Sequence, residues 1–240
     1  MRIPHFGPPF RPAWLISLGL VLLAAPALAQ PHPVSTWTGA AGNNRWDTAG
    51  NWSPAGVPSP DGIAVINSGS PNATALGPDT IHGVNLNGGT LTSAGLTITL
   101  LNQAGGSLAG SHVISGADGV WNWTSGTLYG SCTVSPGGTA NIPGSGEKLL
   151  ADGAALHNHG GIIWTGGPIK GWCYQSGPTL RNYAGARFVC DGGTALTRRY
   201  GQAAHFTGDV GAEFTKPGTG TVDSTWVFNQ QGLLSQAGGA

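Results

Sequence analysis

The feature that most constrains this chain is a short unit that recurs from position 84 onward with a period of about 20 residues. Each copy reads as a short strand, a turn that contains glycine, and a second short strand. The copies are VNLNGGTL (84–91), LNQAGGSL (101–108), WNWTSGTL (121–128), ANIPGSGEKL (140–149), IIWTGGPI (162–169) and LRNYAGARF (180–188), followed by the weaker FTGDVGAEF and WVFNQQGLL. A unit of this size cannot bury an apolar face alone, so the copies must stack on one another as a solenoid.

The residue types decide which solenoid forms. A leucine-rich repeat would show regularly spaced leucines and room for a helical turn, whereas these copies carry β-branched residues, glycine and asparagine. About 20 residues fit one coil of three short strands and three turns, with coils roughly 4.8 Å apart. The sequence therefore predicts an all-β fold, a parallel β-helix (solenoid) with coils of about 20 residues, preceded by a small Trp-rich N-terminal β unit.

Composition agrees with short strands and tight turns. Charged residues make up 8% of the chain, against about 25% in typical domains. Glycine accounts for 42 of 240 residues, and each glycine costs a helix interior about 1 kcal/mol. The 40% hydrophobic content opposes the other interpretation of a glycine-rich chain, which is disorder.

The N-terminal segment has the features of an exported protein. Arg2 and Arg11 precede the apolar run WLISLGLVLL (14–23), and Ala27-Leu28-Ala29 fits the small-x-small pattern that precedes signal-peptide cleavage. The run is shorter than the roughly 20 apolar residues of a membrane span. A retained anchor is the alternative. We expect a signal peptide over 1–29, an exposed linker over 30–36, a Trp-rich β segment over 37–80 and the repeats over 81–240, with no membrane span after cleavage.

The net charge of the chain after the expected cleavage limits the classes of partner that it can bind. Residues 30–240 carry 8 basic and 10 acidic side chains, a net charge of −2. Nucleic-acid binding by phosphate neutralisation needs clustered Lys and Arg, so we expect no nucleic-acid partner. The last copy breaks off in mid-unit at 236–240, which leaves open whether the chain is a fragment of a longer protein or depends on association.

The segment TWTGAAGNNRWDTAGNWSPAGVPSPDGIAVINSG (36–69) carries a family resemblance. Its W-x-G…W…NW…VP…D-x-(A/V)-x-I pattern resembles the N-terminal segment of bacterial secreted β-solenoid repeat proteins of the autotransporter-passenger-like, surface-adhesin-like type. The resemblance covers this segment and, more loosely, the repeats that follow. It implies a β-solenoid at the cell surface or outside the cell, and it implies no particular ligand.

Aligned copies predict columns of like residues along the stack. The reference glycines are Gly89, Gly106, Gly126, Gly146, Gly167 and Gly185, with successive spacings of 17, 20, 20, 21 and 18 in residue number. The apolar column that follows them consists of Leu91, Leu108, Leu128, Leu149, Ile169, Phe188 and Leu234. The column that precedes them consists of Asn85, Asn102 and Asn122, with Asn141 displaced by one position, and predicts a ladder of amide hydrogen bonds. An exposed asparagine stripe that binds ligand is the alternative.

Cysteine positions predict a disulfide. Cys132, Cys173 and Cys190 follow their reference glycines at offsets of 6, 6 and 5, near one column. Stacked neighbours about 4.8 Å apart lie within disulfide range, so a Cys173–Cys190 bridge is predicted. Three buried reduced thiols are the alternative. No CxxC or HxxxH spacing is present, and the close pair His157 and His159 has no third ligand, so the sequence predicts no metal and no cofactor.

Two kinds of carbohydrate chemistry remain as hypotheses. Four tryptophans are candidates for stacking on sugars: Trp121, Trp123, Trp164 and Trp172. Trp123 and Trp164 share a column two coils apart, although Leu86 and Ile142 in the same column favour an inward position. Polysaccharide hydrolysis needs two carboxylates at a defined separation, and the acidic residues are scattered singly. The nearest cluster, Asp191 with Arg198-Arg199, lies in a longer interval between repeats.

The sequence therefore predicts an exported structural or adhesive surface or extracellular module with no catalytic site. The alternative function is a carbohydrate-binding or polysaccharide-active parallel β-helix. Extracellular polysaccharide or other surface proteins are the expected partners.

Overall fold

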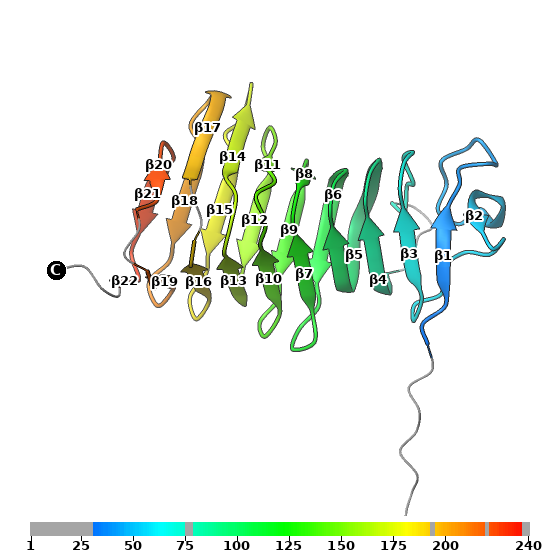
Figure 1. Cartoon of the computed structure of the whole chain (residues 1–240), viewed down its shortest axis with the longest axis horizontal. Helices are drawn as coiled ribbons and strands as arrows, with labels where there is room; N and C mark the ends of the chain where they lie inside the picture. The colour runs from blue at the N-terminus through cyan, green and yellow to red at the C-terminus, as the bar shows by residue number, and fades with distance from the viewer. Residues whose placement is uncertain (1–30, 75–78, 193–194, 219–220, 237–240) are drawn as a thin grey trace, which may run out of the picture. The chain divides into compact units, whose positions relative to one another are not determined.

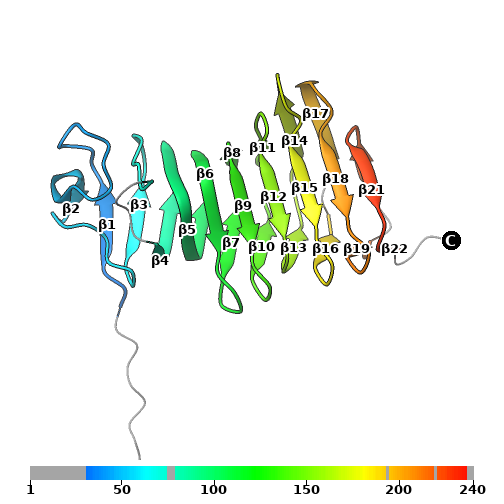
Figure 2. The same ribbon diagram turned by 180° about the vertical axis from the view of Figure 1, so that it is seen from behind.

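The computed structural model describes residues 31–74, 79–192, 195–218 and 221–236. The expected signal peptide, 1–29, lies outside these residues, and residues 32–240 form a separate compact unit. Every described element of this unit is a β-strand except a 3-10 turn, η1 (Ala49–Asn51). From β3 (Ile63–Ile66) to β21 (Val227–Gln230), strands of successive coils lie side by side (Figure 1, Figure 2). The all-β, parallel β-helix prediction is confirmed.

The strands form three columns, which we name the first, second and third faces. The first face comprises β1 (Val34–Trp37), β3, β4 (Thr80–Leu86), β5 (Thr90–Gln103), β7 (Val120–Trp123), β10 (Thr139–Ile142), β13 (Gly161–Trp164), β16 (Arg187–Cys190), β19 (Glu213–Lys216) and β22 (Leu233–Gln236). The second face comprises the start of β5, β6 (Ser107–Ile114), β8 (Gly126–Leu128), β11 (Lys148–Leu150), β14 (Ile169–Cys173), β17 (Ala195–Gly201) and β20 (Asp223–Ser224). The third face comprises parts of β4, β5 and β6, then β9 (Ser131–Val134), β12 (Ala155–Asn158), β15 (Thr179–Asn182), β18 (His205–Gly208) and β21. All of these columns pair in parallel.

Coil length varies along the stack. The register partners on the first face are Ile63, Gly83, Leu100, Val120, Thr139, Gly161, Arg187, Glu213 and Leu233, and their successive differences in residue number are 20, 17, 20, 19, 22, 26, 26 and 20. The period near 20 is thus confirmed outside the two longest coils. Those coils carry the longest strands of the second face in this part of the chain, β14 and β17.

Two assumed equivalences of glycines are wrong. The register partner of Gly126 is Lys148, so Gly146 is displaced by two positions. The second error is larger. Gly167 precedes β14 on the second face, whereas Gly185 precedes β16 on the first face. Gly185 instead matches Gly211 of the next coil, whose carbonyl accepts the Gly185 amide hydrogen bond at 2.9 Å. The extra residues of the 161–187 coil moved the repeated sequence pattern from one face to the next, so columns inferred beyond Gly167 mixed two faces.

The interior is built from alternate residues of each strand, because successive side chains of a strand point to opposite sides. Leu91, Leu108 and Leu128 are register partners and fully buried, as predicted. Leu150, not Leu149, continues their column. Ile169 is buried on the same face but is the register partner of Lys148, two positions before this column. The predicted members Phe188 and Leu234 belong to the first face.

The asparagine ladder forms on the outer side of the first face. Asn85, Asn102, Asn122 and Asn141 are register partners in four successive coils, and Asn141 is in register, not displaced. The Nδ2 atoms of Asn102, Asn122 and Asn141 each donate to the Oδ1 atom of the preceding asparagine at 2.9, 2.9 and 3.0 Å. The amides therefore tie the coils together outside the core.

The Trp-rich segment closes the N-terminal end of the stack. β1 pairs in parallel with β3 and antiparallel with β2 (Trp52–Ser53). Trp52 meets Trp37 and Trp46 edge to face, with ring centroids 5.0 and 4.6 Å apart. Its Nε1 donates to the Trp46 carbonyl at 2.8 Å. This segment extends the first face and shields its first strands.

Candidate functional site

The tryptophan pair predicted for sugar stacking lies inside the solenoid. Trp123 and Trp164 occupy inward positions of β7 and β13 and are fully buried. Trp121 stacks on Trp123 at 4.7 Å, and the Trp164 Nε1 donates to the Gly167 carbonyl at 2.8 Å. Neither indole presents a face to solvent, because both occupy the alternate positions of their strands whose side chains point into the core.

The structure does not bring the predicted disulfide partners together. Cys132, Cys173 and Cys190 lie on the third, second and first faces respectively. The register partner of Cys173 is Gly201, and that of Cys190 is Trp164. All three cysteines are buried and none forms a disulfide. The predicted pairing of Cys173 with Cys190 depended on the incorrect equivalence of Gly167 and Gly185.

The remaining singled-out residues have structural contacts. Arg199, from the cluster considered with Asp191 and Arg198, pairs with Glu147 at 3.5 Å. His157 and His159 both contact Tyr183, through a 3.0 Å hydrogen bond and a 3.9 Å ring stack. Among the described residues, no group of three or more His, Cys, Asp or Glu is placed to hold a metal.

Aromatic side chains gather on the outer side of the second face. Tyr129, Trp172, Tyr174 and Tyr200 form this group, which we name the aromatic cluster. The Trp172 ring centroid lies 6.4, 6.2 and 6.1 Å from those of Tyr129, Tyr174 and Tyr200, all in edge-to-face geometry. The Tyr200 hydroxyl donates to that of Tyr174 at 3.2 Å. The three tyrosines are 46%, 68% and 41% exposed in chain order, an unusual concentration of aromatic surface.

Strand register places these rings in one row. Leu128, Leu150 and Gly171 are register partners, so Tyr129, Ala151 and Trp172 follow them at equivalent outer positions of three successive coils. Ala151 is small and fully buried, which allows the rings of Tyr129 and Trp172 to meet across its coil. Tyr200 is the register partner of Trp172 in the next coil.

A β-bulge brings Tyr200 into the row. Gly171 pairs with Arg198, but Trp172 pairs with Tyr200, so Arg199 is an extra residue in β17. In a regular register without the bulge, Arg199 would pair with Trp172 and Tyr200 with Cys173, and Tyr200 would turn to the opposite side of the strand from Trp172. A bulge of this kind redirects side chains locally, and here Arg198, Arg199 and Tyr200 are all exposed in succession.

Charged groups border the cluster. Glu147 pairs with Lys170 at 2.5 Å and with Arg199 at 3.5 Å. The Arg198 guanidinium donates to the Gly201 carbonyl at 3.2 Å. At the other side, the Asp152 carboxylate accepts hydrogen bonds from the backbone N–H groups of Ser176 and Gln175, which follow Tyr174, at 2.8 and 2.9 Å, and these bonds lower the pKa of Asp152.

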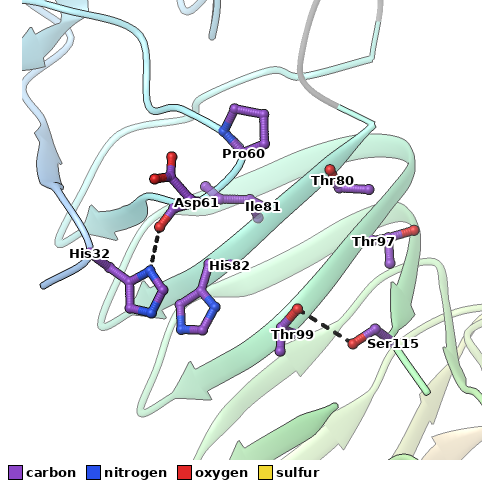
Figure 3. Close-up of a pocket in the computed structure, with 9 residues that line it drawn as sticks. All are labelled: His32, Pro60, Asp61, Thr80, Ile81, His82, Thr97, Thr99 and Ser115. Atoms are coloured by element: carbon purple, nitrogen blue, oxygen red, sulfur yellow. Dashed lines mark hydrogen bonds between the residues drawn. The ribbon is translucent and has the colours of Figure 1, made fainter. Parts of the chain in front are cut away.

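A pocket lies near the N-terminal end of the solenoid (Figure 3). Its volume is about 410 Å³, and hydroxyls of Thr80, Thr97 and Thr99 line it together with His82. His32 stacks face to face on His82 at 3.4 Å, and burial, followed by the nearby His32, lowers the pKa of His82. Figure 3 shows the two imidazole rings alongside each other.

The aromatic cluster was missed at the sequence level except for Trp172. Trp172 and Tyr174 are two positions apart, a spacing that places both on one side of a strand and could have been noticed. Tyr129 and Tyr200 join them through a three-coil register and a bulge, and no local spacing reveals either.

Within the described part of the chain, no helix has the length and apolar character needed to cross a bilayer. No protein-family model matches the chain, and neither a curated protein nor a solved structure matches it at a significant level.

Proposed function

We propose that this protein is an exported structural and adhesive module that acts outside the cell or at its surface by binding, without a catalytic step. The observation that carries the proposal is the aromatic cluster, whose tyrosines are exposed on a solenoid with mostly small and polar residues at its other outer positions. Parallel ladders and the asparagine ladder support a rigid scaffold on which such a surface keeps its shape.

The proposal includes secretion of the protein and its relation to bacterial secreted β-solenoid proteins. The N-terminal charge, apolar run and Ala27-Leu28-Ala29 support secretion with cleavage before Gln30. The resemblance of residues 36–69 supports a place among bacterial secreted β-solenoid proteins. N-terminal sequencing of protein recovered from the periplasm or medium tests the first point, since a chain that begins at Met1 would contradict it.

Adhesion is tested by retention of purified protein on coated surfaces, with polysaccharides, matrix proteins and bare polystyrene in parallel. We expect retention on at least one coating, reduced tenfold or more in Trp172→Ala and Tyr174→Ala. Tyr174 is the better probe, because its 68% exposure means that removing it costs little packing. Circular dichroism and urea midpoints verify that each variant is folded.

Tyr183→Ala is the matched control, because Tyr183 lies on another face and packs against His157 and His159. It should be retained like the unmodified protein. Retention nowhere, or equal retention of every variant, would overturn the adhesive proposal. Shortening of a polysaccharide during incubation, lost in Asp191→Ala, would overturn its non-catalytic part.

A further inference from the structure

The aromatic cluster has an extended shape that suits a chain-like ligand. Tyr129, which follows β8, Trp172 on β14 and Tyr200 on β17 lie along the direction in which coils stack. Three coil steps separate the backbone positions of Tyr129 and Tyr200, a distance of about 14 Å at roughly 4.8 Å a step. A surface of this length offers several successive contacts, whereas a single small molecule would cover one ring.

The cluster is held in place before any ligand arrives. The two hydrogen bonds to the Asp152 carboxylate fix the backbone next to Tyr174, and the Tyr200 hydroxyl fixes the ring of Tyr174. Each ring also meets Trp172 edge to face. Aromatic residues held in this way bind at low entropic cost, because few rotamers are lost on association.

Positive charge concentrates beside the row. Lys170, Arg198 and Arg199 are three of the 8 basic residues in positions 30–240, a region that has 10 acidic ones. Glu147 pairs with two of them, and Asp152 is engaged by backbone N–H groups. Lys170 and Arg199 share the single Glu147 carboxylate, and Arg198 donates to the Gly201 carbonyl, so the cations that adjoin the row outnumber the carboxylates paired with them.

We infer that the aromatic cluster binds an acidic polysaccharide, laid along the stacking direction of the coils; this rests on the proposed adhesive function and names its ligand. Sugar rings have an apolar C–H face that packs on the electron-rich face of an aromatic ring. Uronate carboxylates would pair with Arg198 and Arg199, whose planar guanidinium groups suit a carboxylate. The exposed tyrosine hydroxyls would hydrogen-bond sugar hydroxyls.

Affinity electrophoresis tests this in gels that contain polygalacturonate, alginate, dextran, hydroxyethylcellulose or polyglutamate. We expect retardation by at least one uronate polymer, with a dissociation constant at least fivefold lower than for either neutral polymer, and weakening as salt rises. Trp172→Ala, Tyr174→Ala and the pair Arg198→Gln/Arg199→Gln should each weaken binding tenfold or more. Arg187→Gln, which removes a positive charge on the first face, should not.

The polymers separate the outcomes. Equal retardation by polyglutamate would mean that the protein binds negative charge without recognising sugar rings. Equal retardation by the neutral polymers would mean that the carboxylates of the uronates contribute nothing to binding. Either result overturns the inference. Retardation by none of the sugars overturns it as well. Cluster-dependent retention on a non-carbohydrate coating would in that case leave the adhesive proposal standing.

Oligosaccharides of the bound polymer provide a second test. Binding measured by calorimetry should strengthen from one to about four sugar units and then level off, because the row has a fixed length of about 14 Å. A monosaccharide that binds as tightly as a hexasaccharide would show a single-ring site and overturn the proposed direction of binding.

Discussion

His112 in β6 is the register partner of Cys132 in β9, and both side chains point into the apolar interior. The two ring nitrogens of His112 have no hydrogen-bond partner among the described residues. Leu96 holds the equivalent position in the coil before. An imidazole thus occupies a place in a column built for apolar groups.

This position predicts loss of stability in acid. Burial lowers the pKa of His112 to about 4, from 6.5. The unfolded state therefore binds more protons between these values, and the free energy of unfolding falls as pH drops from 6.5 to 4. At about 1.4 kcal/mol per pH unit the total loss is roughly 3 kcal/mol. Urea unfolding at several pH values measures it.

His112→Leu is the comparison, since leucine matches Leu96 in the adjacent coil. The variant should lose this component of the acid sensitivity while keeping that of the exposed groups. Unfolding free energies that run parallel with pH in the two proteins would show that His112 is not the cause.

The asparagine ladder predicts unequal costs along its length. Asn122 makes two ladder hydrogen bonds, to Asn102 and Asn141, whereas Asn141 makes one. At about 1 kcal/mol per bond, Asn122→Ala should lower the free energy of unfolding by about 2 kcal/mol and Asn141→Ala by about half as much. Equal losses in urea denaturation would contradict a ladder of independent links.

A buried lysine holds two coils together at their turns. The Lys148 Nζ donates to the carbonyls of Pro143, Gly144 and Gly166 at 2.6, 3.0 and 2.9 Å. Burial lowers its pKa to about 8, so the ammonium keeps most of its charge at pH 7. Lys148→Met leaves backbone carbonyls without this donor and should cost about 2 kcal/mol or more.

The control is Lys170→Met in the next coil, where a partly exposed ion pair with Glu147 is lost. That change should stay within about 1 kcal/mol. A Lys148→Met protein as stable as Lys170→Met in thermal unfolding would refute the role given to the buried ammonium.

Peptide mapping of oxidised protein checks the corrected register. Cys173 and Cys190 belong to different faces, so no peptide should link them. A disulfide needs Cα atoms about 4.4–6.8 Å apart with converging side chains. A linked peptide in folded protein would place β14 and β16 on one face and contradict the register described above.

The sequence predicted what depends on local pattern. The period, the buried leucines from Leu91 to Leu128 and the amides from Asn85 to Asn141 follow from residue type and spacing within coils of nearly constant length. Prediction failed first at Leu149, which is out of register by one position. It failed again beyond Gly167, because extra residues within a coil shift the repeated pattern to another face without changing its appearance in the sequence. The aromatic cluster escaped for the same reason, since Tyr129 and Tyr200 meet Trp172 only through register.

Arg199, which has no register partner in β14, shifts the inward–outward alternation of side chains along β17 by one residue. Before Arg199, the alternation turns Leu196 inward. After it the alternation is reversed, so that Tyr200 points outward. The core needs no substitution for this to happen. In a solenoid, inserting one residue into a strand can thus change which side chains that coil exposes, without any substitution in the neighbouring coils.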